Sequence, residues 1–199
     1  MMPPRLLQQM QFVVEIDKLK RVLRQTLLTD GSRRENSAEH SWHIALMAIL
    51  LSEYATEPID VLRVVKMLLL HDLVEIDAGD TFCYDDRGHE SKAEREMQAA
   101  ERLFNLLPPD QASEFRALWD EFEAQTTADA QFAATLDRLQ PLLNNHQTQG
   151  HTWQLHDISR DRVMQRVAPM QGSAPDLWQF VQHLLDECVA NGYLKPTRE

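Results

Sequence analysis

The chain has little glycine and little cysteine, and each shortage narrows what the protein can be. Only six of its 199 residues are glycine, whereas helix-favouring leucine, alanine, glutamate, glutamine and arginine are abundant. The two cysteines, Cys83 and Cys188, lie far apart, and neither belongs to a CxxC pair or a Cys/His cluster. Neither a disulfide framework nor a thiolate zinc site follows, so we expect a protein of the reducing cytoplasm.

Basic residues and long apolar runs are scarce as well. Lysine and arginine total 20 against 31 aspartates and glutamates, which gives a formal charge of −11. Such a charge repels DNA and RNA, so we expect no nucleic-acid polymer as a partner. A small phosphorylated substrate stays compatible, because a bound cation reverses the local potential. No stretch approaches the 18 or more apolar residues of a membrane span, so we expect no membrane association.

What the sequence does contain is a succession of helical patterns divided by glycine, proline and capping residues. Its length fits one domain better than two. The apolar run at residues 64–70 favours a central position for its helix, and no alternation typical of strands is found. The pattern predicts an all-α single domain, with a loop over residues 80–89. The predicted helices cover residues 5–24, 36–54, 59–76, 91–107, 110–125, 126–149, 161–167 and 175–190.

Two adjacent ionisable residues, His71 and Asp72, follow the apolar run. Burying such side chains without partners costs several kcal/mol, so a buried pair needs a metal ion or counter-charges. A helix end that surfaces into water, with His71 beside the negative end of the helix dipole, explains the pair equally well. The pair is therefore a candidate half of a metal site, and taken alone it leaves both interpretations open.

Three residues elsewhere bear on the same question. His40 lies in the first turn of the predicted second helix, where a capping or surface role is common. His43 lies one turn further, and packing is the interpretation we favour for it. Asp137 borders the apolar stripe of the sixth predicted helix, where a buried carboxylate needs a cation and a solvated one pairs with Arg138. Singly, none of the three establishes a site.

Taken together, His40, His71, Asp72 and Asp137 form a mixed nitrogen and oxygen donor set drawn from three predicted helices. Such a set suits Mn²⁺, Fe²⁺, Co²⁺, Ni²⁺, Zn²⁺ or Mg²⁺. The two carboxylates balance a divalent charge, and open coordination positions are left for water and a phosphate oxygen. The four residues therefore predict one divalent metal ion as cofactor.

The order of these residues resembles the HD superfamily of metal-dependent phosphohydrolases. The extended HDxxExxxGD element at residues 71–80 is the most specific part of the match, and residues 19–24, 35–40 and 118–124 also match. The chain is most similar to the branch of HD-domain 5′-deoxynucleotidases. The resemblance implies a single HD-type helical bundle over residues 1–199 with the metal site at its centre. Its core would cover about residues 19–150, with C-terminal helices at about 160–192 packed on it.

The resemblance also implies a role for each site residue. It assigns the metal to the four candidate ligands, and Arg24 matches the family arginine that holds the substrate phosphate. Glu75 and Asp80 match the two acids that handle the attacking water and the leaving oxygen, and which acid does which stays open. Lys92 is a further candidate for phosphate contact, although a solvated helix start explains it better.

The implied reaction is hydrolysis of (deoxy)nucleoside 5′-monophosphates to nucleoside and phosphate, by a homodimer. Another HD phosphohydrolase, acting on a nucleoside triphosphate, a cyclic dinucleotide or guanosine tetraphosphate, would keep the same ligands. The short chain, without an extra regulatory domain, argues against the last of these. A non-catalytic protein that binds a metal or nucleotide, and a helical interaction module with a coincidental motif, are the remaining alternatives.

One position departs from the bacterial deoxynucleotidase pattern. There the phosphate arginine is followed by a tryptophan that lies against the sugar, whereas this chain has Gln25 after Arg24. A flat apolar wall disfavours a 2′-hydroxyl, but a glutamine amide can hydrogen-bond to one. The substitution predicts only a weak preference for deoxyribonucleotides.

Overall fold

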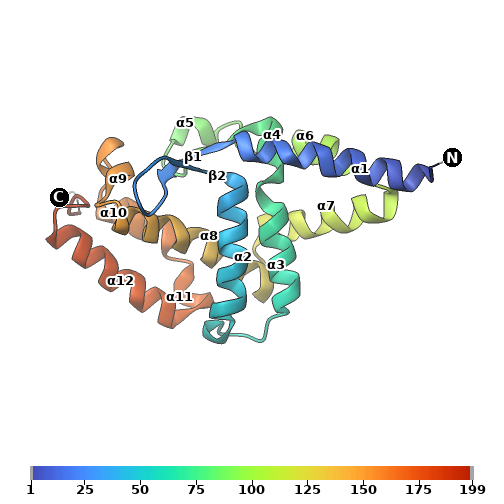
Figure 1. Ribbon diagram of the computed structural model, residues 1–199. Helices are drawn as coiled ribbons and strands as arrows, with labels where there is room; N and C mark the ends of the chain where they lie inside the picture. The colour runs from blue at the N-terminus through green and yellow to red at the C-terminus, as the bar shows by residue number, and fades with distance from the viewer. Residues whose placement is uncertain (1, 198–199) are drawn as a thin grey trace.

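The computed structural model describes residues 2–197 and shows a helical protein with one small sheet (Figure 1). The helical fold expected from the sequence is confirmed. The α-helices are α1 (Pro4–Ile16), α2 (Ser37–Leu51), α3 (Val61–Leu70), α4 (Glu75–Ala78), α5 (Asp86–His89), α6 (Lys92–Phe104), α7 (Pro109–Ala124), α8 (Ala128–Gln147), α9 (His151–Leu155), α10 (Arg160–Val167), α11 (Met170–Ser173) and α12 (Pro175–Ala190). Three 3₁₀ turns, η1 (Asp17–Arg21), η2 (Ser52–Tyr54) and η3 (His71–Val74), and two strands, β1 (Leu23–Leu27) and β2 (Arg34–Asn36), complete the described elements.

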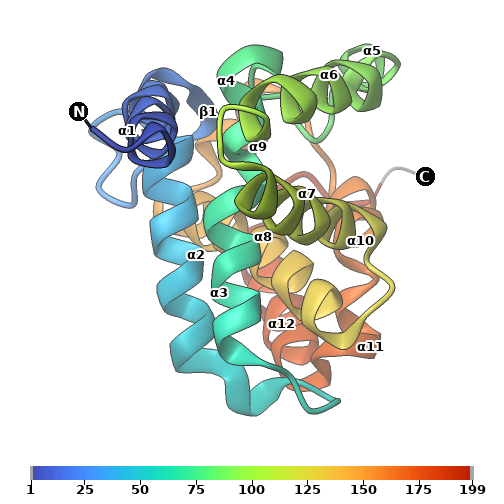
Figure 2. The same cartoon turned by 90° about the vertical axis from the view of Figure 1, so that its right-hand side faces the viewer.

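The centre of the molecule is the pair α2 and α3, which stand side by side in both views, with α8 packed against both (Figures 1 and 2). The buried side chains Ile44, Leu68 and Leu136, one from each of these helices, belong to one continuous apolar core. Helices α11 and α12 cover α8 on the far side. The strongly apolar third helix therefore does lie centrally.

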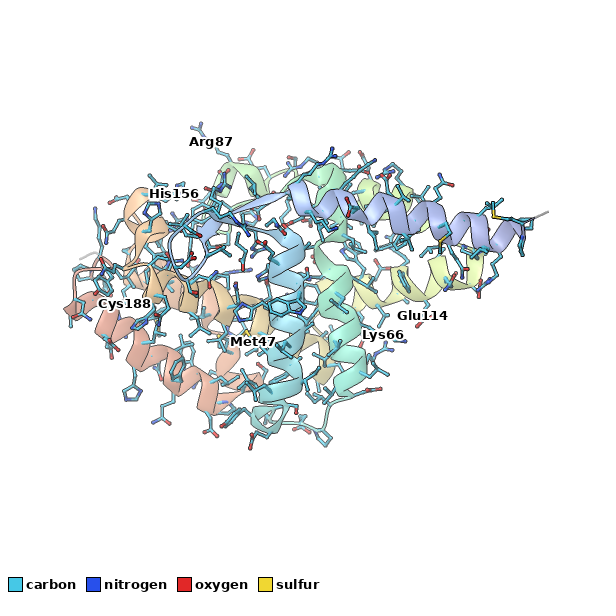
Figure 3. All side chains as sticks on the ribbon, viewed as in Figure 1. Met47, Lys66, Arg87, Glu114, His156 and Cys188 are labelled. Atoms are coloured by element: carbon cyan, nitrogen blue, oxygen red, sulfur yellow. The ribbon has the colours of Figure 1, made fainter. Side chains whose placement is uncertain are left out.

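Helix α1 forms an arm that extends along α7 at one end of the molecule (Figure 1). Arg5 donates two hydrogen bonds to Asp110 at the start of α7, at 2.7 and 2.8 Å. Lys66 of α3 and Glu114 of α7 approach one another, and Lys66 Nζ donates to Glu114 Oε1 at 2.9 Å (Figure 3). Within the described residues, every helix is too short or too polar to cross a bilayer.

The prediction of one helix over residues 5–24 and of no strands is wrong. The helix stops at Ile16, and after η1 the chain becomes the antiparallel hairpin β1–β2, in which Leu23 pairs with Asn36 and Leu27 with Arg34. Gly31, at a φ of 71°, makes the turn between the strands. The paired backbone of β2 supplies hydrogen bonds that outweigh the helical preference of the first strand.

The predicted helix over residues 59–76 is also interrupted, and the interruption lies at the chemically interesting residues. The α-helical pattern ends at Leu70, residues 71–74 form η3, and α4 follows. A 3₁₀ turn holds three residues instead of 3.6, so it changes the directions in which successive side chains point. Three short helices, α5, α9 and α11, were not predicted because their apolar patterns are too short to register, and α5 lies inside the segment 80–89 that was predicted to be a loop.

Candidate metal centre and its cavity

His71 and Asp72 lie in η3, where the central helix α3 ends inside the protein instead of surfacing. Their exposed fractions are 5% and 7%, so the solvated helix end considered above is excluded. His71 Nε2 lies 3.0 Å from Asp72 Oδ1. The 3₁₀ turn thus holds both side chains toward the same point.

His40 and Asp137 meet this pair from two other helices. A capping box between Asn36 and Glu39 fixes the start of α2, which places His40 in the first turn with no exposed surface. His40 Nε2 lies 3.0 Å from Asp137 Oδ1 on α8, and His71 Nε2 lies 3.7 Å from the same oxygen. The structure therefore brings all four candidate ligands together, and donor atoms of His40, His71 and Asp72 lie within 4.8 Å of one another.

The hydrogen bond on the outer nitrogen of His71 shows what its inner nitrogen needs. His71 Nδ1 lies 2.9 Å from the Leu68 carbonyl oxygen, which only accepts, so Nδ1 carries the proton. In the neutral ring Nε2 is then a lone pair, yet it faces Asp72 Oδ1 and is buried with no hydrogen-bond partner among residues 2–197. A lone pair beside a carboxylate is repulsive unless a cation lies between them. The donor set therefore fits a bound metal ion.

The orientation of His40 is fixed in the same way through Gln140 and Glu35. Gln140 Nε2 donates to Glu35 Oε1 at 2.7 Å, which turns Gln140 Oε1 toward His40 Nδ1, 3.0 Å away. His40 Nδ1 must therefore donate, and its Nε2 presents a lone pair toward Asp137. The sequence analysis missed both Glu35 and Gln140. Only the position of Gln140, one helical turn after Asp137, could have indicated it.

The four ligands create a strongly cation-attracting point. Burial tends to lower the pKa of His71, but Asp72 and Asp137 outweigh this effect and raise the pKa well above its ordinary value. Burial tends to raise the pKa of Asp72, but the charges of His71 and Arg24 lower it to about 2. The pKa of Asp137 is held well below its ordinary value, despite burial, by the two histidines. A proton on the His71 imidazole meets the same demand that a metal ion would.

Arg24 extends from β1, and its guanidinium lies beside the candidate metal ligands. Its Nη1 donates to Asp72 Oδ2 at 3.0 Å, its Nε lies 3.8 Å from Glu35 Oε2, and its Nη2 lies 4.0 Å from Asp137 Oδ1. Thr26, two positions along the strand and hence on the same face, donates its hydroxyl to Glu35 Oε2 at 3.4 Å. The hairpin that the sequence failed to predict is therefore what orients this guanidinium.

Glu75 and Asp80 also lie at the centre. Glu75 begins α4, is 6% exposed, and accepts a hydrogen bond from the Ser37 hydroxyl at 2.6 Å. Gly79 adopts a φ of 74° after α4, and this left-handed turn redirects the chain so that Asp80 lines the cavity. Burial, reinforced by the charge of Asp72, raises the pKa of both carboxyl groups.

The remaining candidates take lesser places. Lys92 lines the cavity but donates to Glu96 at 2.7 Å, so its charge is already paired. His43 faces Gln140, with Nδ1 at 3.3 Å from the amide nitrogen, which agrees with a packing role. Cys83 lines the cavity, and it is an exposed residue with a free thiol.

The metal centre borders a cavity of about 200 Å³. Its acidic lining consists of Asp72, Glu75, Asp80, Glu96, Glu123 and Asp137. Its arginine lining consists of Arg24, Arg138 and Arg166, and its aromatic lining of Phe82, Tyr84, Phe122 and Trp153. The sequence analysis missed Arg166 of α10 altogether and treated Arg138 only as a surface partner of Asp137. The cavity thus offers a cation site, anion-binding guanidiniums and flat apolar surfaces side by side.

Comparison with known proteins adds a family and two kinds of relatives. A family model described as HD domain matches residues 16–178. The chain is 33% identical over 135 residues to the 5′-deoxynucleotidase HDDC2 of Bos taurus and 32% identical to that of Homo sapiens. In each case the match covers 67% of this chain but only 64% and 65% of the relative.

Among solved structures, the chain is similar to a predicted metal-dependent phosphohydrolase from Magnetospirillum magnetotacticum MS-1. The two are 58% identical and superpose with a TM-score of 0.94 over 98% of this chain and 100% of that one. The PH0347 protein of Pyrococcus horikoshii OT3 has a TM-score of 0.62 at 18% identity, over 92% and 99% of the two chains, and shows the shared fold alone.

Proposed function

The chain belongs to the HD-domain family, as its sequence resemblance indicated, and we propose that it is a metal-dependent phosphohydrolase which removes the phosphate of nucleoside 5′-monophosphates. The observation that carries this proposal is the convergence of two histidines, two aspartates and Arg24 on one buried centre, of which His71, Asp72, Asp137 and Arg24 line the cavity. The similarity to 5′-deoxynucleotidases and to a metal-dependent phosphohydrolase supports it.

His40, His71, Asp72 and Asp137 would hold the ion, because their donor atoms converge and both imidazoles turn an Nε2 lone pair inward. Two neutral imidazoles with two carboxylates suit Mn²⁺, Co²⁺, Fe²⁺, Ni²⁺, Zn²⁺ or Mg²⁺. Such an ion, when bound, polarises a phosphoryl group and lowers the pKa of a water molecule.

Arg24 is the residue that we assign to the substrate phosphate. Its planar fork of N–H donors matches the spacing of phosphate oxygens. Asp72 and Glu35 hold the guanidinium from two sides, so it is positioned before the substrate arrives and little conformational entropy is lost on binding. The aromatic lining offers flat surfaces on which the nucleobase can stack.

Glu75 and Asp80 are the groups that we assign to proton transfer. The oxygen of the attacking water forms a bond to phosphorus as the bond from phosphorus to the 5′-oxygen breaks. One acid takes the proton from the water, and the other gives a proton to the 5′-oxygen, which leaves as the nucleoside hydroxyl. Burial raises the pKa of both carboxyl groups, which suits groups that gain and lose protons near neutral pH. The Ser37 hydroxyl holds Glu75 in place.

The test is phosphate release from a panel of esters by protein loaded in turn with each candidate ion. We expect turnover of 5′-monophosphates, none after chelation, and far less with 3′-monophosphates. The panel also contains nucleoside triphosphates, a cyclic dinucleotide and guanosine tetraphosphate, so that another HD phosphohydrolase activity is detected. Absence of turnover on every ester with every ion would contradict the proposal and favour a non-catalytic binding protein.

We also propose that the protein is a homodimer that works in the cytoplasm. The outer face of α2 presents Trp42, Leu46, Ile49 and Leu50, each at least half exposed, on one side of the helix. An apolar patch of this kind usually marks an interface. Light scattering should give the mass of two chains, and Ile49→Glu should give one. Phe180→Glu, at an exposed apolar residue of α12, is the control.

Both cysteines carry free thiols, as is usual in a reducing compartment.

A further inference from the structure

Two arginines approach the same carboxylate of the metal centre from different elements. Arg24 Nη2 of β1 lies 4.0 Å from Asp137 Oδ1, and Arg166 Nη2 of α10 lies 3.8 Å from Asp137 Oδ2. Both guanidiniums line the cavity. Asp137 therefore lies between them, and an anion bound beside the Asp137 carboxylate lies within reach of both.

A third arginine strengthens this positive charge. Arg138 follows Asp137 on α8, against which α10 packs, and it also lines the cavity. Its Nη2 donates to the neutral amide oxygen of Gln125 at 2.8 Å, and its Nε is buried without a hydrogen-bond partner among the described residues. Two guanidiniums that share a cavity wall repel one another unless an anion lies between or beside them.

The charges of Arg138 and Arg166 are less well satisfied than those of several arginines elsewhere in the molecule. Arg5, Arg33 and Arg160 each donate to a carboxylate at 2.7 Å or less, as expected in a chain with 31 acidic and 20 basic residues. Within residues 2–197, the ion pair found for Arg166 is the longer contact with Asp137, whose charge a metal ion would largely take up. The surplus charge faces the cavity in which the substrate must bind.

We propose that Arg166, supported by Arg138, is a second phosphate-binding arginine, which clamps the phosphoryl group from the side opposite Arg24. The inference rests on the proposed phosphohydrolase function, because it names the anion as the phosphate monoester or the inorganic phosphate released from it. A phosphoryl group presents three non-bridging oxygens, and one arginine fork engages at most two of them. Arg166 supplies donors for an oxygen that Arg24 leaves free.

The test measures binding of inorganic phosphate to Mn²⁺-loaded protein by calorimetry, and it compares Arg166→Gln with Arg160→Gln. Both residues lie on α10, but Arg160 pairs with Asp186 away from the cavity. Removing a charged hydrogen-bond donor should raise the Kd for phosphate about ten- to a hundredfold in Arg166→Gln. We expect no change in Arg160→Gln. Arg166→Lys, which keeps the charge but loses the fork, should fall between them.

Metal content and melting temperature are measured on all variants, and we expect neither to change. Equal phosphate affinity in Arg166→Gln and Arg160→Gln would overturn the clamp. Loss of metal from Arg166→Gln would overturn it too, because the residue would then support the metal centre instead. Loss of nucleotide affinity at unchanged phosphate affinity would show that Arg166 reads the nucleoside.

The phosphate measurement needs no turnover, so the clamp and the proposed function can fail separately. If phosphate binds through Arg166 but no ester is hydrolysed, the clamp stands and the proposed function fails. If 5′-monophosphates are hydrolysed and Arg166→Gln leaves both KM and phosphate affinity unchanged, the proposed function stands and the clamp fails.

Discussion

The acidic lining and the arginine lining of one cavity differ in how much of each comes from a single stretch of the chain. Three acids of the lining, Asp72, Glu75 and Asp80, come from one continuous stretch, in which η3, α4 and the turn at Gly79 direct the carboxylates inward; the other three come from α6, α7 and α8. Arg24, Arg138 and Arg166 come from β1, α8 and α10, and they meet only because the whole chain folds. A local motif therefore supplies two of the four candidate metal ligands and both acids assigned to proton transfer, whereas the tertiary structure adds His40 and Asp137 and assembles the groups that hold the anion.

We expect substitutions in the acidic lining to reduce metal binding and turnover. The largest effect should come from Asp72→Ala. This change removes a charged ligand and the hydrogen-bond partner of Arg24. We expect loss of stoichiometric metal, read by elemental analysis, and loss of phosphate release. Asp77→Ala, at an exposed residue one turn away that pairs with Arg102, is the matched control. Full metal and normal turnover in Asp72→Ala would refute the ligand assignment.

Glu75→Gln should separate proton transfer from metal binding within the acidic lining. The amide keeps the size of the side chain and can still accept from Ser37, but it cannot take a proton. We expect kcat to fall by roughly 10²–10⁴ while metal content stays at the wild-type level. The exposed Glu101 provides the control variant Glu101→Gln. A kcat near that of the wild type would transfer the role to Asp80.

Gln140 forms hydrogen bonds with both His40 and Glu35. Gln140→Met should therefore moderately disturb both the metal centre and the position of Arg24. The change leaves His40 Nδ1 without its acceptor, and it removes the Gln140 donor from Oε1 of Glu35, the carboxylate beside Arg24. Loss of such a supporting hydrogen bond typically weakens metal affinity about ten- to a hundredfold. Metal titration of the variant measures this change, with Gln147→Met, at an exposed position on the same helix, as control. Unchanged metal affinity would mean that packing alone orients His40.

The smallest expected effect is on the preference between deoxyribonucleotides and ribonucleotides, and it involves a residue next to Arg24. Gln25 follows Arg24 on β1 and lines the cavity where a tryptophan would form a flat wall. A buried hydroxyl left without a partner costs about 1–3 kcal/mol, but an amide beside it can offset that cost. We expect less than about tenfold preference in kcat/KM for dAMP over AMP and for dUMP over UMP. A preference of several hundredfold would show that another residue reads the sugar.

The same contrast explains how far the sequence alone could lead. The HDxxExxxGD element could be interpreted because it lies within ten consecutive residues and its order resembles that of the HD superfamily. The helical fold followed from composition and periodicity. The β1–β2 hairpin did not, because strand pairing is a non-local interaction that outweighs the local helical pattern of residues 23–27.

The supporting residues were hidden for the same reason. Glu35 and Gln140 lie 105 positions apart, and only the observed hydrogen bond shows that they form a unit. Arg166 stands in a polar, ordinary-looking helix, α10, and its significance comes from the distance to Asp137. A sequence pattern indicates which face of a helix is buried, but it does not indicate which distant helix packs against that face.

The long sequence separations across the metal centre bear on the order in which the protein folds. The contacts of His40 with Asp137 and with Gln140 span 97 and 100 residues, so neither can form before both halves of the chain have met. Closing such large loops is entropically costly, and contacts of this kind commonly form late. An ion at this centre would therefore act on the finished protein. It should slow unfolding and leave the rate of folding nearly unchanged, so that the metal lengthens the lifetime of the native state rather than guiding the chain toward it.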